Sequence, residues 1–267
     1  MSVAAAAAQP VGAFDSGLGG LSILRAVRAR LPHEDLIYVA DAGYLPYGEK
    51  TVAEIQTRAL TVSEFLIAQG AKAILVACNT ATAAAIELLR ERLPVPFVGV
   101  EPAIKPAVSM TRSGRIGVLA TGATTGSVRL GNLLRRFGHS VEIIVQPCPG
   151  LVEQVEAGLA GSDETRRMVE GYVQPLVARG IDTLVLGCTH YPFLEQAIRA
   201  AAGPSVTLLD TGEPVARELA RQLETRGLAR SHGQGDERFW TSGTPASLAA
   251  RIAPLWGRRV EVLPLSR

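Results

Sequence analysis

The sequence predicts an α/β protein made of two similar lobes, each with a parallel sheet covered by helices on both faces. The first observation behind this prediction is the regular alternation of short apolar strands with amphipathic helices. The second is an internal repeat. The segments AILVACNT at 73–80 and TLVLGCTH at 183–190 both read as a buried strand that ends in a cysteine and polar residues.

The repeat extends beyond these strands. Each strand follows an amphipathic helix closed by a glycine, and Gly70 precedes Cys78 by the same interval as Gly180 precedes Cys188. A duplicated chain with one thiol in each half suggests a cleft with a thiol on each wall.

The first half of the chain supports this architecture element by element. The segment 21–31 has apolar residues at helical spacing and ends before Pro32. Predicted in order are a strand at 11–14, a helix at 21–31, a strand at 36–39, a helix at 52–68, the strand ending at Cys78, a helix at 80–93 and a strand at 97–100. We expect the alanine-rich start, 1–10, to be a frayed tail.

The second half repeats the order. Predicted are a strand at 115–120, a helix at 127–137, a strand at 141–145, a helix at 163–178, a strand at 184–187, a helix at 191–202 and a strand at 206–209. The remainder from Glu213 reads as a helix, a polar loop at 231–236, a strand around Phe239, a short helix through Leu248 and a strand at 260–263.

The remainder has no counterpart between the halves, so we expect it to pack back onto the first lobe. The predicted lobe one is therefore discontinuous, with residues 1–102 and 212–267, and lobe two comprises residues 103–211. We expect flavodoxin-like lobes related by a pseudo-twofold axis, with the active site in the cleft between them.

Composition excludes several classes of protein. A 47% hydrophobic and 19% charged chain is globular, and a net charge of +2 gives no electrostatic case for nucleic-acid binding. Three cysteines do not suggest a disulfide framework. No apolar run approaches the roughly 18–20 residues that span a bilayer, so we expect a soluble, cytoplasmic protein that binds no membrane.

Polar residues follow the predicted strands, and ligands of parallel sheets bind at the carboxyl ends of strands. The residues at these ends are Asp15, Asp41, Cys78, Glu101, Thr121, Cys148 and Cys188. A substrate carbon held between Cys78 and Cys188 would lose a proton to one thiolate and gain one from the other thiol. The product would be the mirror image.

The thiols need partners for this chemistry. The pKa of a free thiol is about 8.5, far below that of an amino-acid Cα–H. The site must therefore stabilise the anionic intermediate. Backbone amides at Asn79-Thr80 and Thr189-His190, at predicted helix starts, are suitable donors for a carboxylate. His190 could accept the proton of Cys188 and return it, and Asp15 could do the same for Cys78.

Taken together, these residues resemble glutamate racemases, the cofactor-independent enzymes of the aspartate/glutamate racemase superfamily. The motifs that carry the resemblance are Phe14-Asp15-Ser16-Gly17-x-Gly19-Gly20, Leu45-Pro46-Tyr47-Gly48, Ala77-Cys78-Asn79-Thr80-Ala81-Thr82, Ala120-Thr121 with Thr124, Cys148-Pro149-x-Leu151-Val152-Glu153, and Gly187-Cys188-Thr189-His190-Tyr191-Pro192.

The resemblance implies that Cys78 serves D-glutamate and Cys188 serves L-glutamate, with no cofactor. It implies substrate contacts from Asp15, Ser16, Tyr47, Gly48, Asn79, Thr80, Thr121, Thr189 and His190. It also implies a homodimer that supplies D-glutamate for peptidoglycan.

Other interpretations stay open at this point. They are a racemase for aspartate or another acidic amino acid, a cysteine hydrolase using Cys188 and His190, and a two-lobed binding module for a dicarboxylate. A nucleotide site at the glycine turn, a pyridoxal Schiff base on one of three lysines, and zinc binding are disfavoured.

Overall fold

The computed structural model describes residues 3–265, and the chain divides into two compact units. The first unit contains the described residues up to Val100 together with those from Gly212 onward, and the second is Glu101–Thr211. The predicted division after residue 102 differs from the observed one by two residues.

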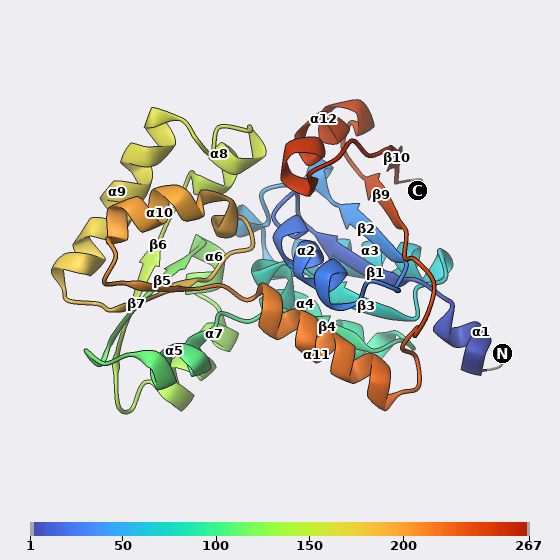
Figure 1. The fold of residues 1–267 in the computed structure, drawn as a ribbon, viewed down its shortest axis with the longest axis horizontal. Coiled ribbons are helices and arrows are strands. Elements are labelled where there is room, and N and C mark those ends of the chain that lie inside the picture. The colour runs from blue at the N-terminus through green and yellow to red at the C-terminus, as the bar shows by residue number, and fades with distance from the viewer. Residues whose placement is uncertain (1–2, 266–267) are drawn as a thin grey trace. The chain divides into compact units, whose positions relative to one another are not determined.

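The first unit is built on a six-stranded sheet with the order β10-β9-β2-β1-β3-β4, in which every neighbouring pair is parallel (Figure 1). Its strands are β1 (Val11–Asp15), β2 (Leu36–Ala40), β3 (Ala73–Val76), β4 (Phe97–Gly99), β9 (Glu237–Thr241) and β10 (Val262–Pro264). The central order β2-β1-β3-β4 is that of flavodoxin-like folds.

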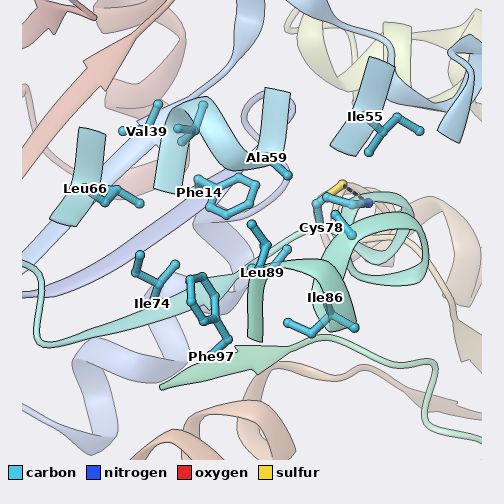
Figure 2. Packing of buried hydrophobic residues seen from close by; sticks show 14 of the residues in the cluster. Phe14, Val39, Ile55, Ala59, Leu66, Ile74, Cys78, Ile86, Leu89 and Phe97 are labelled. Atoms are coloured by element: carbon cyan, nitrogen blue, oxygen red, sulfur yellow. Dashed lines mark hydrogen bonds between the residues drawn. The ribbon is translucent and has the colours of Figure 1, made fainter. Parts of the chain in front are cut away.

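Helices cover both faces of this sheet (Figure 1). On one face α3 (Val52–Ala68) packs against α4 (Asn79–Arg92), and on the other α2 (Leu21–Arg30) packs against α11 (Gly212–Thr225). A further helix, α12 (Pro245–Trp256), contacts α2 and β9. The core between the sheet and α3 and α4 holds large apolar side chains such as Phe14 (Figure 2).

The second unit has a four-stranded parallel sheet with the order β6-β5-β7-β8. Its strands are β5 (Arg115–Ala120), β6 (Glu142–Pro147), β7 (Thr183–Leu186) and β8 (Thr207–Leu209). Its helices are α5 (Ile104–Met110), α6 (Gly122–Thr125), α7 (Val128–Phe137), α8 (Leu151–Glu156), α9 (Asp163–Ala178) and α10 (Glu195–Ala202). One buried cluster joins the sheet to α8, α9 and α10, and another joins it to α5.

The repeat seen in the sequence is present in the backbone. Gly70 follows α3 by two residues with φ +86°, and Gly180 follows α9 by two residues with φ +78°. A left-handed residue at this position ends a helix, and glycine adopts it without a steric penalty. After each glycine the chain enters the strand that leads to a cysteine, as predicted.

The predicted return of the final segment to the first sheet is also observed. Strand β9 pairs with β2 in parallel register, Tyr38 opposite Phe239, and β10 pairs with β9. The helix at 52–68 and that at 163–178 have the predicted bounds. The first begins with a capping box between Thr51 and Glu54.

Several short elements were not predicted, namely α5, α6, α8 and the 3₁₀ turns at Ala42–Tyr44 (η1) and Tyr47–Glu49 (η2). The expectation of a frayed start is wrong for Val3–Ala7, which forms helix α1; residues 1 and 2 lie outside the described part. Alanine favours helix, and Lys72 Nζ donates to Ala7 O at 2.6 Å. Among the described helices, none combines the length and apolar character of a bilayer span.

Candidate active site

Several predicted site residues follow two neighbouring strands in each sheet. In the first unit, Asp15 ends β1 and Cys78 follows β3, and the helices after these neighbouring parallel strands, α2 and α4, cover opposite faces of the sheet. In the second unit, Thr121 follows β5 and Cys188 follows β7, which are paired in the same way. This is the topological switch point, where parallel sheets of this type bind ligands.

Cys78 occupies the N-cap position of α4 and is 5% exposed (Figure 2). The amide of Ala81 donates a hydrogen bond to its Sγ at 3.4 Å. The thiol lies 3.9 Å from Ser16 Oγ, to which it donates. An amide at a helix start favours negative charge on its acceptor, so this position suits a thiolate.

Asp15 connects Cys78 to the glycine turn through Ser16. Its carboxylate accepts from the Ser16 amide at 2.6 Å, the Ser16 hydroxyl at 3.2 Å and the Gly20 amide at 2.5 Å. Gly20 has to be glycine because a Cβ would stand 2.8 Å from Tyr38 Oη. Asp15 therefore holds the turn and orients Ser16 toward Cys78.

Asn79 is the clearest candidate for a ligand-binding side chain in the first unit. It is 4% exposed, and both its amide nitrogen and its amide oxygen lack a hydrogen-bond partner among the described residues. A buried, unpaired polar group costs about 1–3 kcal/mol, which a ligand with a donor and an acceptor would recover. Asn79 and the buried Thr80 form the first turn of α4, directly beside Cys78.

Tyr47 and Gly48 lie in the loop between β2 and α3. Tyr47 is buried and donates from Oη to Asp41 Oδ2 at 2.5 Å. Burial, reinforced by Asp41, raises the pKa of Tyr47 well above its usual range and keeps the hydroxyl a donor. Gly48 is half-buried in the same 3₁₀ turn.

Cys188 lies at the matching position of the second unit and is 6% exposed. It is preceded by Gly187, where a Cβ would stand 2.5 Å from Leu119 O, so the chain leaves β7 tight against β5. Cys188 Sγ is 3.7 Å from Nδ1 of His190, and both side chains are buried.

His190 is held from its other side by Glu156, at the end of α8. The distance between His190 Nε2 and Glu156 Oε1 is 2.8 Å. Burial alone would lower the pKa of His190, but the hydrogen bonds to Cys188 and Glu156 outweigh it and hold this pKa well above its usual range. The three residues can therefore carry an imidazolium between a thiolate and a carboxylate.

The other predicted residues of the second unit have simpler surroundings. Thr121 caps α6 through its Oγ1, which accepts from the Thr124 amide at 3.3 Å, and Thr189 is buried between Cys188 and His190. Cys148 follows β6, and burial raises the pKa of its thiol to about 12. Such a thiol stays protonated and does not serve as a base.

Sequence reasoning missed Glu156. The motif that carries the resemblance ends at Glu153, which is exposed, whereas Glu156 lies about one turn further along α8 next to the buried Val155. The signal available in the sequence was a carboxylate on the apolar side of a short helix, where an acid needs a partner.

Comparisons with known proteins agree with this geometry. The sequence matches the Asp/Glu/Hydantoin racemase family over residues 21–219. It is 55% identical over 258 residues to a glutamate racemase of Methylococcus capsulatus, covering 96% of this chain and 95% of that protein. A glutamate racemase of Ectopseudomonas mendocina is 52% identical over 95% of this chain and 97% of its own length.

Solved structures give the same result. The glutamate racemase RacE1 of Bacillus anthracis superposes with a TM-score of 0.89 at 33% identity, over 97% of each chain. The Escherichia coli glutamate racemase, solved with L-glutamate and the activator UDP-MurNAc-ala, superposes with a TM-score of 0.85 at 33% identity, covering 96% of this chain and 97% of that one.

The chain belongs to the Asp/Glu/Hydantoin racemase family, a family of isomerases. Within that family its similarity to glutamate racemases runs along nearly the whole sequence.

Proposed function

We propose that this enzyme interconverts L-glutamate and D-glutamate, with Cys78 and Cys188 acting on opposite faces of the substrate Cα. The observation that carries the proposal is the matched pair of buried thiols at the two switch points, each with its own proton-handling partners. The named relatives are glutamate racemases, which favours glutamate over aspartate as substrate.

The reaction balances with two thiols. One cysteine, as thiolate, takes the Cα proton and becomes a thiol, leaving a carbanion on the substrate. The other, as thiol, gives its proton to the opposite face of Cα and becomes a thiolate. The enzyme then holds the protonation state needed for the reverse reaction. We assign deprotonation of D-glutamate to Cys78 and of L-glutamate to Cys188.

The neighbouring residues have supporting roles. His190 and Asp15 act as auxiliary acid/base groups, His190 directly at Cys188 and Asp15 through Ser16 at Cys78. The amide of Asn79 and the first turn of α4 bind the substrate, together with Ser16, Thr80, Tyr47, Gly48, Thr121 and Thr189. No group beyond these residues is required, so we propose a reaction independent of pyridoxal phosphate.

The test is incubation with L-glutamate in D₂O without pyridoxal phosphate, followed by optical rotation and Cα deuteration. Loss of rotation with one deuterium incorporated at Cα supports the proposal. Retention of rotation, or faster turnover of aspartate than of glutamate, contradicts it.

One observation favours a second candidate. The chain Cys188–His190–Glu156 has the order of groups found in cysteine hydrolases, in which the imidazole activates the nucleophile and a carboxylate orients the imidazole. This reading leaves Cys78 and Asn79 without a role. Release of ammonia from glutamine, or of alcohol from a glutamyl ester, by wild type but not by Cys188→Ala would support it.

We further propose that the enzyme acts in the cytoplasm as a homodimer and supplies D-glutamate for peptidoglycan. The named relatives are bacterial glutamate racemases, and D-glutamate has a structural use in bacterial walls. Sedimentation velocity tests the dimer. Depletion of the protein should cause lysis that external D-glutamate prevents, and lysis unaffected by D-glutamate would contradict the assigned role.

A further inference from the structure

A buried carboxylate, that of Asp41, forms a hydrogen bond to the loop that carries Tyr47 and Gly48. Asp41 follows β2, is fully buried, and accepts the Tyr47 hydroxyl at 2.5 Å. Its backbone amide donates to Asp15 O at 2.9 Å, so Asp41 also adjoins the turn that orients Ser16. The position of Tyr47 in this loop therefore depends on where the Asp41 side chain is held.

Arg58, on α3, holds that side chain with two parallel hydrogen bonds. Its Nε donates to Asp41 Oδ2 at 3.0 Å and its Nη2 donates to Asp41 Oδ1 at 2.8 Å. The Arg58 side chain is 14% exposed, against 0% for Asp41. A fork of this kind fixes the plane of the carboxylate as well as its position.

Arg58 also contacts the first turn of the loop. Its guanidinium carbon lies 3.7 Å from the centre of the Tyr44 ring. The same side chain therefore touches the loop at Tyr44 and, through Asp41, holds Tyr47. Gly48 directly follows Tyr47 in the same 3₁₀ turn.

The charge balance explains why an arginine is needed. Asp41 without a cation would be a buried carboxylate with the Tyr47 hydroxyl as its neutral donor, and burial strongly disfavours an unpaired charge. A lysine would supply the charge but only from a single point, without the fork.

We propose that Arg58 is a positioning residue for the substrate loop, acting through Asp41 to set the place of Tyr47 and Gly48. The inference rests on the function proposed above. Arg58 contributes to glutamate affinity in both directions, whereas proton transfer is left to the two thiols and their partners.

The structure offers a direct way to test this role. Arg58 lines a cavity of about 730 Å³, with Tyr44, Thr61, Phe65, Gln69 and Ser242 among its other walls. Truncation of Arg58 to alanine would leave its guanidinium site open to this cavity. Ethylguanidinium added to the solution could then occupy the site and replace the missing fork.

The experiment measures kcat, KM and the Cα deuterium isotope effect for wild type, Arg58→Ala, Arg58→Lys and the control Arg221→Ala. Arg221 forms an exposed ion pair with Glu218 in the same unit. For both Arg58 variants we expect KM for each enantiomer to rise about tenfold, with kcat within about threefold and an unchanged isotope effect. Ethylguanidinium should restore the KM of Arg58→Ala only.

Three outcomes would overturn the inference. They are an unchanged KM in both Arg58 variants, a lower kcat with a larger isotope effect at constant KM, and failure of ethylguanidinium to lower the KM of a folded Arg58→Ala. If Arg58→Ala does not fold, Arg58→Gln with Asp41→Asn removes both charges, and a normal KM in that double variant sinks the inference. Inactive wild type would instead contradict the proposed function, and the role of Arg58 with it.

Discussion

The two thiol sites share a backbone frame but differ in what stabilises the sulfur. Cys78 and Cys188 both follow the strand next to the first strand of their sheet, and both are almost completely buried. Cys78 accepts from the Ala81 backbone amide, whereas Cys188 is paired with the imidazole of His190, which Glu156 supports.

The cause of this difference lies in the chain just after each cysteine. In the first unit α4 begins at Asn79, so backbone amides of its first turn lie beside Cys78, and that of Ala81 donates to the sulfur. In the second unit the helical turn begins only at Tyr191, two residues after Thr189, and Cys188 has a side chain rather than a helix start beside it. The two copies of the fold therefore stabilise a cysteine sulfur differently: a backbone amide at a helix start does so for Cys78, and the imidazole of His190 does so for Cys188.

The largest effect is expected from removing either sulfur. Cys78→Ala and Cys188→Ala should each lower kcat/KM by at least about 10³-fold, because each removes one of two obligatory proton carriers. Polarimetry measures the loss. Cys148→Ala is the matched control, since it removes a buried thiol that has no part in proton transfer, and near-normal turnover in either of the first two variants would refute the scheme.

His190→Asn should have the next largest effect, a loss of about 100-fold in kcat/KM. The equilibrium constant between enantiomers is one, so kcat/KM falls equally in both directions, and the asymmetry has to be read from isotope effects. We expect the Cα deuterium effect to increase with L-glutamate and not with D-glutamate. An increase with D-glutamate instead would reverse the assignment of the two thiols.

Glu156→Gln should cost about tenfold in kcat/KM, because it replaces a charged hydrogen-bond acceptor of His190 by a neutral one. Glu156 raises the pKa of His190, so its neutralisation lowers that pKa. The imidazolium is then lost at lower pH, and the alkaline limb of the pH–kcat/KM profile should move to lower pH. A limb that stays in place would show that His190 does not govern it.

Ser16→Ala should have the smallest effect, a loss of about threefold, because the Cys78 to Ser16 contact is long at 3.9 Å. The isotope effect should increase with D-glutamate, the mirror image of the His190 result. A loss as large as that of His190→Asn would mean that Cys78 depends on side chains as strongly as Cys188 does.

Local pattern was sufficient for much of the fold and for the thiols. The helical spacing of apolar residues and the glycine after each helix predicted the bounds of α3 and α9. The ends of the predicted strands pointed to Asp15, Cys78, Thr121 and Cys188 as candidate site residues. These features depend on neighbours in the sequence.

Partners that meet only through tertiary packing were not predictable in this way. Glu156 reaches His190 across 34 residues of sequence and Arg58 reaches Asp41 across 17, and no periodicity links either pair. The helix at Val3–Ala7 was missed for the same reason, since a lysine far along the chain binds its last carbonyl.

The placement of β9 beside β2 has a consequence for biosynthesis. The second unit forms one uninterrupted stretch, so it can complete its core while translation continues. In the first sheet, in contrast, one edge of β2 has no partner strand until the ribosome has released Glu237–Thr241, which forms β9. During that interval the edge of β2 exposes unpaired backbone amides and carbonyls, which other nascent chains could pair with.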